Sequence, residues 1–364
     1  MILWRVIASN LRSMPVSIKD IARLAGVSHS TVSRALRNNP LIPPETTNRI
    51  RKIADEQGYL ASAVARGLVT SKTEAIGVVV TSIADPFNGE VVVGIEELAN
   101  EHGYTVILAN SQADAAREVA VVRSFKARRV DGVLMASSRV GALHTPRLSE
   151  LKIPIVLLNN QHPSAFVHSV RLDNVTGAYW AARHLVELGH HRIAYLGDRF
   201  GLHSDAERYE GYCKMMAEAG LRVEEQLIVH ADGKPEGAAH AASRLLSLRE
   251  PPTAILCYND MSALGVLRQA AVQAMAVPKD LSVTGFDDIF FAGYLQPPLT
   301  TVRQPMREMG RRATELLLSL LRGEKNDHTL LIEGELIVRG STAPPRTRSY
   351  QSILSGKNSV TRSS

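Results

Sequence analysis

The sequence holds few of the residues that metal clusters, disulfide frameworks and membrane spans require. Its 364 residues include only two cysteines, Cys213 and Cys257, each in a segment of apolar pattern. There is no run of about 18 apolar residues, so no transmembrane span is predicted. Residues 1–7 are apolar but lack the basic lead-in and cleavage site of a signal peptide. These absences predict a protein of the reducing cytoplasm that has no membrane partner.

Enzyme signatures are also missing. The sequence has no G-x-S-x-G motif, no Walker loop and no His or Cys residues at metal-ligand spacing. We interpret His190 and His191 as a pair at a helix end, where positive charge suits the helix dipole. We therefore expect a protein that is not an enzyme and that has no catalytic residues, no metal and no cofactor.

Positive charge is concentrated at the start of the chain. Residues 1–72 contain eleven Lys and Arg against four Asp and Glu, whereas residues 73–364 contain 31 against 32. Because neutralisation of phosphates supplies most non-specific affinity for DNA, a basic segment of this kind indicates a DNA-binding module. The chain is long enough for two or three domains, and its 45% hydrophobic content is ordinary for a globular protein.

Residues 17–36 predict two short helices joined by a turn. Ser17 can cap the first helix, with Asp20 completing a capping box, and Gly26 permits the turn before Ser28 caps the second helix. In the first helix we expect a buried stripe of Ile21, Leu24 and Ala25. An ordinary hairpin of two helices is the alternative for this spacing.

The second helix of this pair has an apolar and a polar face. Its apolar face contains Val32, Ala35 and Leu36. Its outer face carries side chains that can bond to DNA: His29, Ser30, Ser33, Arg34 and Arg37. A helix of this shape fits the major groove and reads base edges with its N-terminal half.

The rest of the first 72 residues divides into short segments. Residues 43–59 predict a third helix, which completes a DNA-binding domain of residues 17–61. Residues 62–72 form a linker whose segment 62–68 is too short for a stable helix on its own. Residues 1–16 read as an N-terminal extension, because translation could equally start at Met14. The Pro-, Ser-, Arg- and Thr-rich residues 344–364 are expected to be disordered.

Beyond Thr73, short apolar runs alternate with amphipathic helices. Such runs are typical of strands buried on both faces of a parallel sheet. They occur at residues 76–80, 105–109, 132–136, 155–158, 192–196, 227–230, 254–258 and 281–286. This alternation of strands and helices occurs twice along the chain. We therefore predict an α/β core of two doubly wound parallel-sheet subdomains in addition to the small all-α head. Ligands of such sheets bind beyond the carboxyl ends of the strands.

The motifs, in this order, resemble the Lac repressor/Gal repressor family of bacterial transcription regulators over roughly residues 17–344. The motifs that carry the resemblance are I-A-R-L-A-G-V-S-H-S-T-V-S-R-A-L, V-A-R-G-L, R-V-D-G-V-L, R-Y-E-G-Y, Y-N-D-M-S-A-L-G, S-V-T-G-F-D-D and L-T-T-V-R-Q. The resemblance implies a core like that of periplasmic sugar-binding proteins. This core comprises residues 73–343, divided into an N-subdomain (73–172 and 304–333) and a C-subdomain (173–303 and 334–343). It further implies a cytoplasmic, nucleoid-associated homodimer that represses carbohydrate-utilisation genes and binds a pseudo-palindromic DNA operator.

The resemblance also assigns roles in the head. His29, Ser30 and Arg34 would contact bases, and an Arg at the last position can form a bidentate bond to guanine. A phosphate contact is the alternative for Arg34. The expected phosphate contacts are Ser17, Ser28, Thr31 and Ser33. In the hinge, Leu68 would enter the minor groove as a wedge, and the small Ala65 would let two hinge helices pack. Relatives usually carry Pro-Asn where Ala61-Ser62 stands here, so the start of this helix is less rigid.

A small effector, a sugar or a sugar derivative, is expected between the two subdomains. By resemblance its site is lined by Asp85, Phe87, Ser137, Asn159, Arg208, Asn259, Asp287 and Gln304. Asn259 could instead simply cap a helix, Asp287 could be a turn residue, and Arg208 could be a surface charge. Arg208 would also suit a carboxylate or phosphate, so a purine or a phosphorylated metabolite stays open. A solute-binding protein shares this core, but it would need export and would have no basic head. No leucine heptad follows Thr342, so a dimer is expected rather than a tetramer built by the tail.

Overall fold

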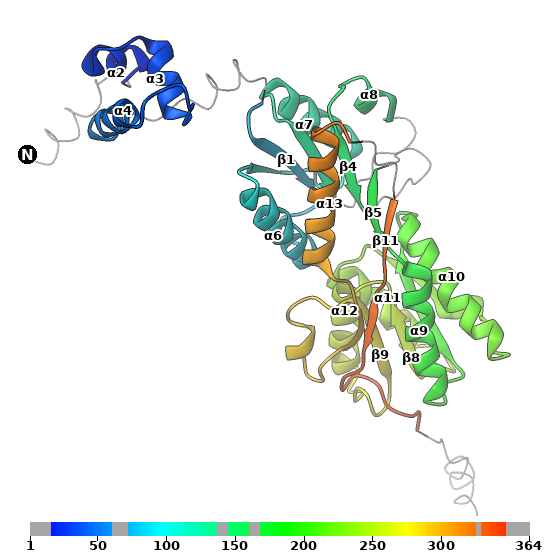
Figure 1. Ribbon diagram of the computed structural model, residues 1–364. Coiled ribbons are helices and arrows are strands. Elements are labelled where there is room, and N and C mark those ends of the chain that lie inside the picture. Colours follow the sequence, from blue (N-terminus) through cyan, green and yellow to red (C-terminus); the bar gives the residue numbers. More distant parts are fainter. Residues whose placement is uncertain (1–15, 60–71, 137–144, 160–167, 325–328, 347–364) are drawn as a thin grey trace, which may run out of the picture. The chain divides into compact units, whose positions relative to one another are not determined.

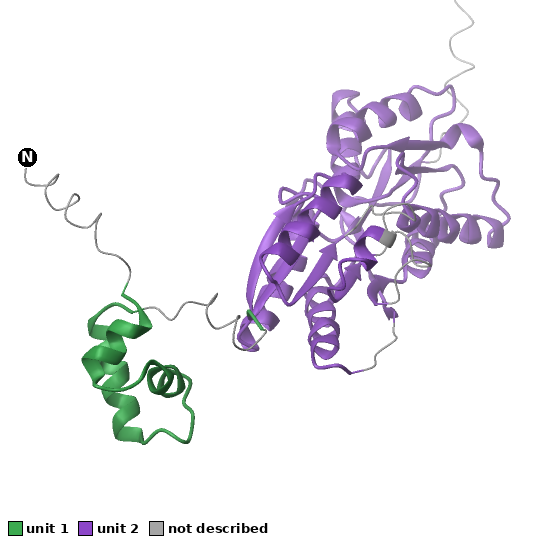
Figure 2. Cartoon of the chain, turned by 90° about the horizontal axis from the view of Figure 1, so that it is seen from above, with its two compact units in different colours: residues 1–73 green, residues 74–364 purple. Residues whose placement is uncertain are grey.

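The computed structural model describes residues 16–59, 72–136, 145–159, 168–324 and 329–346. The chain forms two compact units, residues 1–73 and 74–364 (Figure 2). Within the described residues, none of the helices has the length and apolar character needed to cross a membrane.

The first unit contains α2 (Ile18–Ala25), α3 (His29–Leu36) and α4 (Pro44–Glu56). The predicted capping box is confirmed: the Ser17 hydroxyl accepts from the Asp20 amide, and the Asp20 carboxylate accepts from the Ser17 amide. Gly26 adopts a φ of 65°, which only glycine reaches without strain, and this left-handed residue ends α2. The Ser28 hydroxyl then accepts the Thr31 amide and caps α3.

The expected buried stripe of α2 is wrong at one position. Leu24 is 53% exposed, whereas Ala22 is buried together with Ile21 and Ala25. A helix advances about 100° per residue, so Ala22 and Ala25 lie on the same side of Ile21 and Leu24 on the other. Only the alanine side faces α3 and α4, and the core of the head is centred there.

The second unit contains two six-stranded sheets, as predicted (Figure 1). The N-sheet has the order β11-β5-β4-β3-β1-β2 and is parallel throughout. The C-sheet has the order β12-β10-β9-β8-β6-β7, and only β12 is antiparallel to its neighbour. The strands are β1 (Ala75–Val80), β2 (Thr105–Asn110), β3 (Gly132–Ala136), β4 (Ile155–Leu158), β5 (Ser169–Leu172), β6 (Ile193–Asp198), β7 (Ile228–Ala231), β8 (Ala254–Cys257), β9 (Ser282–Asp287), β10 (Thr300–Arg303), β11 (Thr329–Ile332) and β12 (Glu335–Ile337).

Helices connect successive parallel strands and pack against the sheets. They are α6 (Pro86–Glu101), α7 (Ala115–Ala127), α8 (Thr145–Ser149), α9 (Asn174–Glu187), α10 (His203–Glu218), α11 (Pro235–Leu246), α12 (Asp260–Val272) and α13 (Met306–Leu321), with the 3₁₀ turns η1 (Glu225–Leu227) and η2 (Ala292–Tyr294). The chain passes between the two sheets after β5, after β10 and after β11. The two sheets are therefore joined by three crossings of the chain.

Two strands expected to be buried on both faces are not, namely the edge strands β2 and β7; in β7, Ile228 and Val229 are only half-buried and His230 is exposed. β2 is the edge strand of the N-sheet, and Ile107 and Leu108 in it are 36% and 40% exposed. The apolar run of β2 resembles those of the inner strands, and the sequence pattern alone does not reveal which strand lies at the edge of a sheet.

The interpretation of His190 as a charged helix-end residue is also wrong. His190 is buried, and its ring nitrogens lie 2.8 Å from Thr253 Oγ1 and 3.0 Å from the Ala343 carbonyl. Burial lowers the pKa of this imidazole, so the ring is neutral. Its hydrogen bonds join Thr253, directly before β8, to Ala343 near the end of the core.

Candidate ligand cleft and DNA-binding face

The head presents the predicted outer face of α3. His29, Ser30 and Arg34 are exposed, whereas Val32 and Ala35 on the opposite face are buried. The side chain of Ser33 is half-buried, and its hydroxyl accepts a hydrogen bond of 3.0 Å from Arg37. His29 and Ser30 are therefore exposed in the first turn of α3 and Arg34 in its last turn, on a helix that belongs to a basic unit.

Three hydroxyls gather at the N-terminus of α3. The Ser28 oxygen lies 2.8 Å from that of Ser30 and 2.9 Å from that of Thr31. A helix N-terminus attracts anions through its free amides and dipole, so this cluster offers a place for a phosphate. The Ser17 hydroxyl instead donates to Asp20 at 2.7 Å, which occupies its only donor. Ala65 and Leu68 of the expected hinge lie outside the described residues.

The core contains a cleft of about 500 Å³ where the carboxyl ends of strands from both sheets meet. That size is typical of sites for drug-sized molecules. Seven of the eight residues predicted to contact an effector line it, namely Asp85, Phe87, Asn159, Arg208, Asn259, Asp287 and Gln304. The eighth, Ser137, lies outside the described residues.

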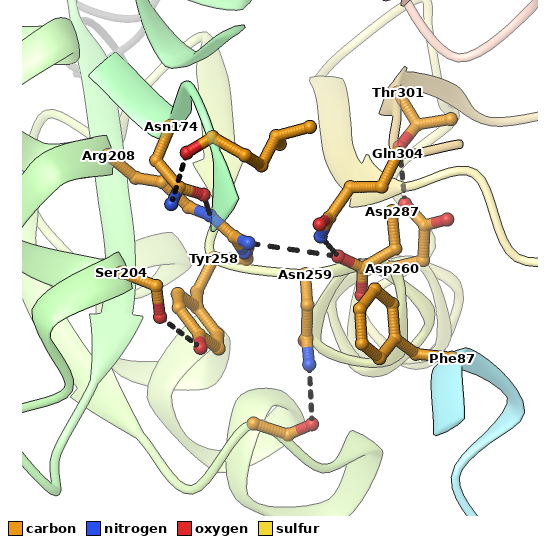
Figure 3. Close-up of polar contacts among 12 residues, drawn as sticks. Phe87, Asn174, Ser204, Arg208, Tyr258, Asn259, Asp260, Asp287, Thr301 and Gln304 are labelled. Atoms are coloured by element: carbon orange, nitrogen blue, oxygen red, sulfur yellow. Dashed lines mark hydrogen bonds and ion pairs between the residues drawn. The ribbon is translucent and has the colours of Figure 1, made fainter. Parts of the chain in front are cut away.

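Arg208 on α10 is the central cation of the cleft (Figure 3). It is 3% exposed, and its guanidinium carbon stands 3.7 Å from the centre of the Phe286 ring and 4.6 Å from that of Tyr258. Its Nε donates to Asn174 Oδ1 at 2.9 Å, and another nitrogen donates to the Tyr258 carbonyl. This packing fixes the plane of the guanidinium, so it is not the surface charge that a lone Arg on a helix could be.

Asp287 faces this arginine from the end of β9. One of its oxygens lies 3.9 Å from an Arg208 nitrogen and accepts a 2.6 Å hydrogen bond from Gln304 Nε2. Burial raises the pKa of Asp287 well above its usual value, although Arg208 opposes that shift. Gln304 is 2% exposed, and its Oε1 has no hydrogen-bond partner among the described residues. Such a buried acceptor is uncommon and is suited to a donor on a ligand.

The capping alternative for Asn259 is confirmed, and a second lining residue, Asp85, caps a helix in the same way. The Asn259 side chain accepts the Ser262 amide at 2.8 Å and caps α12, and it also lines the cleft. Asp85 likewise accepts the Phe87 amide at 3.1 Å at the start of α6. Burial raises the pKa of Asp85. Capping holds these side chains at the rim of the cleft in one orientation.

The cleft extends beyond the predicted residues, and we distinguish two halves. The inner half is defined by Asp85, Phe87, Asn159, Arg208, Asn259, Asp287 and Gln304, and it includes residues that follow β1, β4, β8 and β9. The outer half, defined by Asn110, Gln112, Asp198, Asp232 and Lys234, follows β2, β6 and β7. None of the residues of the outer half was predicted from the sequence, nor were Thr81, Ser82, Ala113, Leu202, Ser204, Gly233 and Tyr258. The sequence feature that could have indicated the outer half is that each of its residues follows a predicted strand.

A basic head with a groove-reading helix, joined to a two-lobed core around a buried polar cleft, defines the class of ligand-responsive DNA-binding regulators. Residues 17–62 match the family model for bacterial regulatory proteins of the lacI family, and residues 182–342 match that for a periplasmic binding protein-like domain. The chain belongs to the lacI family. It is a DNA-binding transcriptional regulator and not an enzyme.

Its relatives are similar over almost their whole length. The chain is 36% identical to the HTH-type transcriptional repressor CytR of Escherichia coli strain K12, over 90% of this chain and 96% of the relative. It is 33% identical to the repressor PurR of Photobacterium profundum, over 89% and 98%. The solved Lac repressor dimer bound to operator and an anti-inducer matches with a TM-score of 0.83 and 26% identity, covering 91% and 100%. A CelR–cellobiose complex matches with a TM-score of 0.69 and 28% identity, covering 90% and 99%.

Proposed function

We propose that this protein is a homodimeric repressor of carbohydrate-utilisation genes, and that a neutral polyhydroxylated effector in the cleft changes its affinity for a pseudo-palindromic operator. The observation that carries the effector class is the group of Arg208, Asp287 and Gln304. It offers donors and acceptors side by side, including the buried Gln304 oxygen, to vicinal hydroxyls. The Phe87 ring at the same cleft supplies an apolar face for a sugar ring. The relatives with cellobiose bound and with ribose bound support this class.

The charge of the cleft argues against a phosphorylated effector. Its lining contains four carboxylates, of Asp85, Asp198, Asp232 and Asp287, against two cations, of Arg208 and Lys234. Arg208 already faces Asp287, and Arg199 lies 3.9 Å from Asp232, so a phosphate would compete with these carboxyl groups for the cations. A neutral ligand avoids that competition.

Thermal unfolding of the full chain tests the effector class. Each of a panel of sugars, sugar acids, sugar phosphates and purines is added at high concentration. A ligand at about 100 times its Kd adds about 2.7 kcal/mol to the native state, which raises the Tm by a few degrees. We expect the shift with neutral sugars or sugar derivatives. A shift with sugar phosphates alone would contradict the charge argument.

For the head, we propose that His29, Ser30 and Arg34 contact bases and that Ser17, Ser28, Thr31 and Ser33 contact phosphates. Exposure on α3 supports the base contacts, and the cluster of the Ser28, Ser30 and Thr31 hydroxyls supports phosphate contacts at the helix N-terminus. The Ser17 hydroxyl would have to exchange its hydrogen bond to Asp20 for one to a phosphate, and the Ser33 hydroxyl accepts from Arg37. Arg34→Ala should cost about 1–3 kcal/mol on the specific operator and much less on random DNA. Fluorescence anisotropy with both duplexes measures the two losses. Equal losses would make Arg34 a phosphate contact.

The dimer and the hinge complete the proposal. The Lac repressor is solved as a dimer, and here α6 and α12 leave apolar side chains exposed, with Val93 at 36% and Val272 at 72%. We place the dimer surface at these helices. The subdomains 73–172 with 304–333 and 173–303 with 334–343 would change their angle when the effector binds. That change would reposition Ala65 and Leu68 on DNA in the bacterial nucleoid.

A further inference from the structure

Positive charge is concentrated at one end of the core, where the chain enters it from the linker. In the parallel N-sheet, the neighbouring strands β1, β3 and β4 all begin at this end. Just before β1, the Glu74 amide donates a 2.9 Å hydrogen bond to Asp131 Oδ2, just before β3. The turns that lead into β3 and β4 therefore lie beside the point at which residues 62–72 join the core. The ligand cleft lies at the opposite ends of the same strands.

The surface at this end consists of residues 123–131 and 147–152, and we call it the entry face. It comprises the end of α7, most of α8 and the turns that follow them, and the two helices share one apolar cluster that includes Phe125 and Leu148 (Figure 1). Residues 73–364 contain 31 Lys and Arg against 32 Asp and Glu, and six and two of these belong to the entry face, which leaves 25 against 30 for the rest. The six cations are all exposed, namely Arg123, Lys126, Arg128, Arg129, Arg147 and Lys152. The core is therefore acidic elsewhere and basic at this end.

Most of these cations have no internal partner. Within the part of the chain that the structure describes, no hydrogen bond or ion pair engages the side chains of Arg123, Lys126, Arg128, Arg147 and Lys152. Exposed arginines on α13 differ, because Arg307 pairs with Glu90 at 2.8 Å and Arg311 with Glu101 at 3.0 Å. Cations without an internal partner remain available for an anionic partner from outside the core.

The length of the linker determines which partner can reach the entry face. Tyr59 is the last described residue of the head and Lys72 the first of the core. Thirteen residues of extended chain span at most about 45 Å, so a duplex held by α3 is tethered to this end of the core. A duplex bound by the head is therefore the polyanion closest to hand.

We propose that the entry face is a second DNA-binding surface, which contacts phosphates of the duplex that the head binds. Lys and Arg side chains are the common donors to phosphate oxygens, and such contacts add affinity without reading the sequence. The core then contributes electrostatic affinity, while α3 reads the bases. This inference rests on DNA binding by the head and is independent of the effector class.

The salt dependence of DNA binding by the full chain tests this. The probe is a random-sequence DNA duplex, whose affinity is measured by fluorescence anisotropy between about 50 and about 200 mM salt. The variant Arg128→Gln/Arg147→Gln/Lys152→Gln removes one cation from each of three segments: the turn after α7, α8 itself, and the turn before β4. One lost phosphate contact should make the slope of log K against log salt less negative by about 0.9. Over this salt range, the affinity ratio of variant and unchanged protein should then change by at least about 3.5-fold.

A matched control variant is Arg244→Gln/Arg249→Gln/Lys279→Gln. It also replaces two arginines and one lysine that are exposed and whose side chains make no hydrogen bond or ion pair with another described residue, but these lie between the last turn of α11 and the start of β9. It removes the same charge from the core, and it should leave the slope unchanged. Thermal unfolding without DNA should give the Tm of the unchanged protein for both variants, because the replaced side chains support no internal contact.

Three results would overturn the proposal while DNA binding by the head stands. One is an entry-face variant whose slope equals that of the unchanged protein at the same affinity. Another is an equal change of slope in both variants, which would be an effect of net charge alone. The third is a weaker affinity at an unchanged slope, which would place these cations against the linker instead of DNA. If the unchanged protein itself binds the duplex without salt dependence, the phosphate contacts proposed for the head fail as well.

Discussion

The contact between Arg208 and Asp287 gives a prediction that needs no ligand. We consider Arg208→Met, Asp287→Asn and the double variant, which form a mutant cycle. Both side chains are almost buried, at 4% and 10% exposure, with 3.9 Å between nitrogen and oxygen. Coulomb's law at an effective dielectric constant of about 20 gives about 4 kcal/mol at this separation. Residues in contact show coupling free energies of about 0.5–3 kcal/mol in such cycles, so we expect a coupling of about 1–3 kcal/mol.

This coupling should depend on pH, because burial raises the pKa of Asp287 well above its usual value. Below that raised pKa the carboxyl is neutral. Arg208→Met then loses only the hydrogen bonds to Asn174 and the Tyr258 carbonyl and the two ring contacts. Above it the carboxylate pairs with Arg208, and the variant leaves a buried charge without its partner. The loss of stability on Arg208→Met must therefore grow as the pH rises.

Urea unfolding of the four proteins across a pH series, from the lowest to the highest pH at which all four fold, measures this change. Trp180 lies on α9 of the core and reports its unfolding by fluorescence. We expect a coupling free energy near zero at the lowest pH and of at least about 1 kcal/mol at the highest pH. A coupling below about 0.5 kcal/mol at every pH would show that the two groups do not interact.

Two further predictions concern packing and pH. On α13, Gly310→Ala would place a Cβ 2.2 Å from the Val91 carbonyl oxygen of α6, so it should lower the free energy of unfolding by about 1–3 kcal/mol. The control Gly89→Ala on α6 meets nothing within 4 Å and should stabilise the core by up to about 1 kcal/mol, and equal effects in urea unfolding would contradict this packing. Burial raises the pKa of Asp260 from 3.8 to about 7, so between these values the folded state keeps a proton that the unfolded state has lost. The free energy of unfolding should fall as the pH rises through this window, and Asp260→Asn should flatten that fall in denaturation curves measured across it.

The sequence predicted the two-sheet core because apolar runs of four to six residues in the inner strands are long enough to recognise. It missed β5, β10, β11 and β12, whose sequences S-V-R-L, T-T-V-R, T-L-L-I and E-L-I are short and mostly mixed with polar residues. Their pairing is set by tertiary contacts between segments far apart in the chain, such as β11 with β5. The predictions for Leu24 and His190 were wrong for a related reason, because the burial of each side chain depends on which elements pack against it.

The cleft was predicted only in its inner half, and the backbone explains part of the difference. Among its lining residues, Gln112, Ala113, Asn159 and Asp287 have positive φ angles of 56°, 58°, 48° and 121°. Asn and Asp tolerate this region and can be suspected from sequence, but Gln and Ala cannot. Holding such residues in this conformation costs about 1–3 kcal/mol each and requires a surrounding structure that fixes them. The ends of β2 and β9 are where this strain is held, so the orientation of these lining residues depends on the packing of both sheets and not on their own sequence.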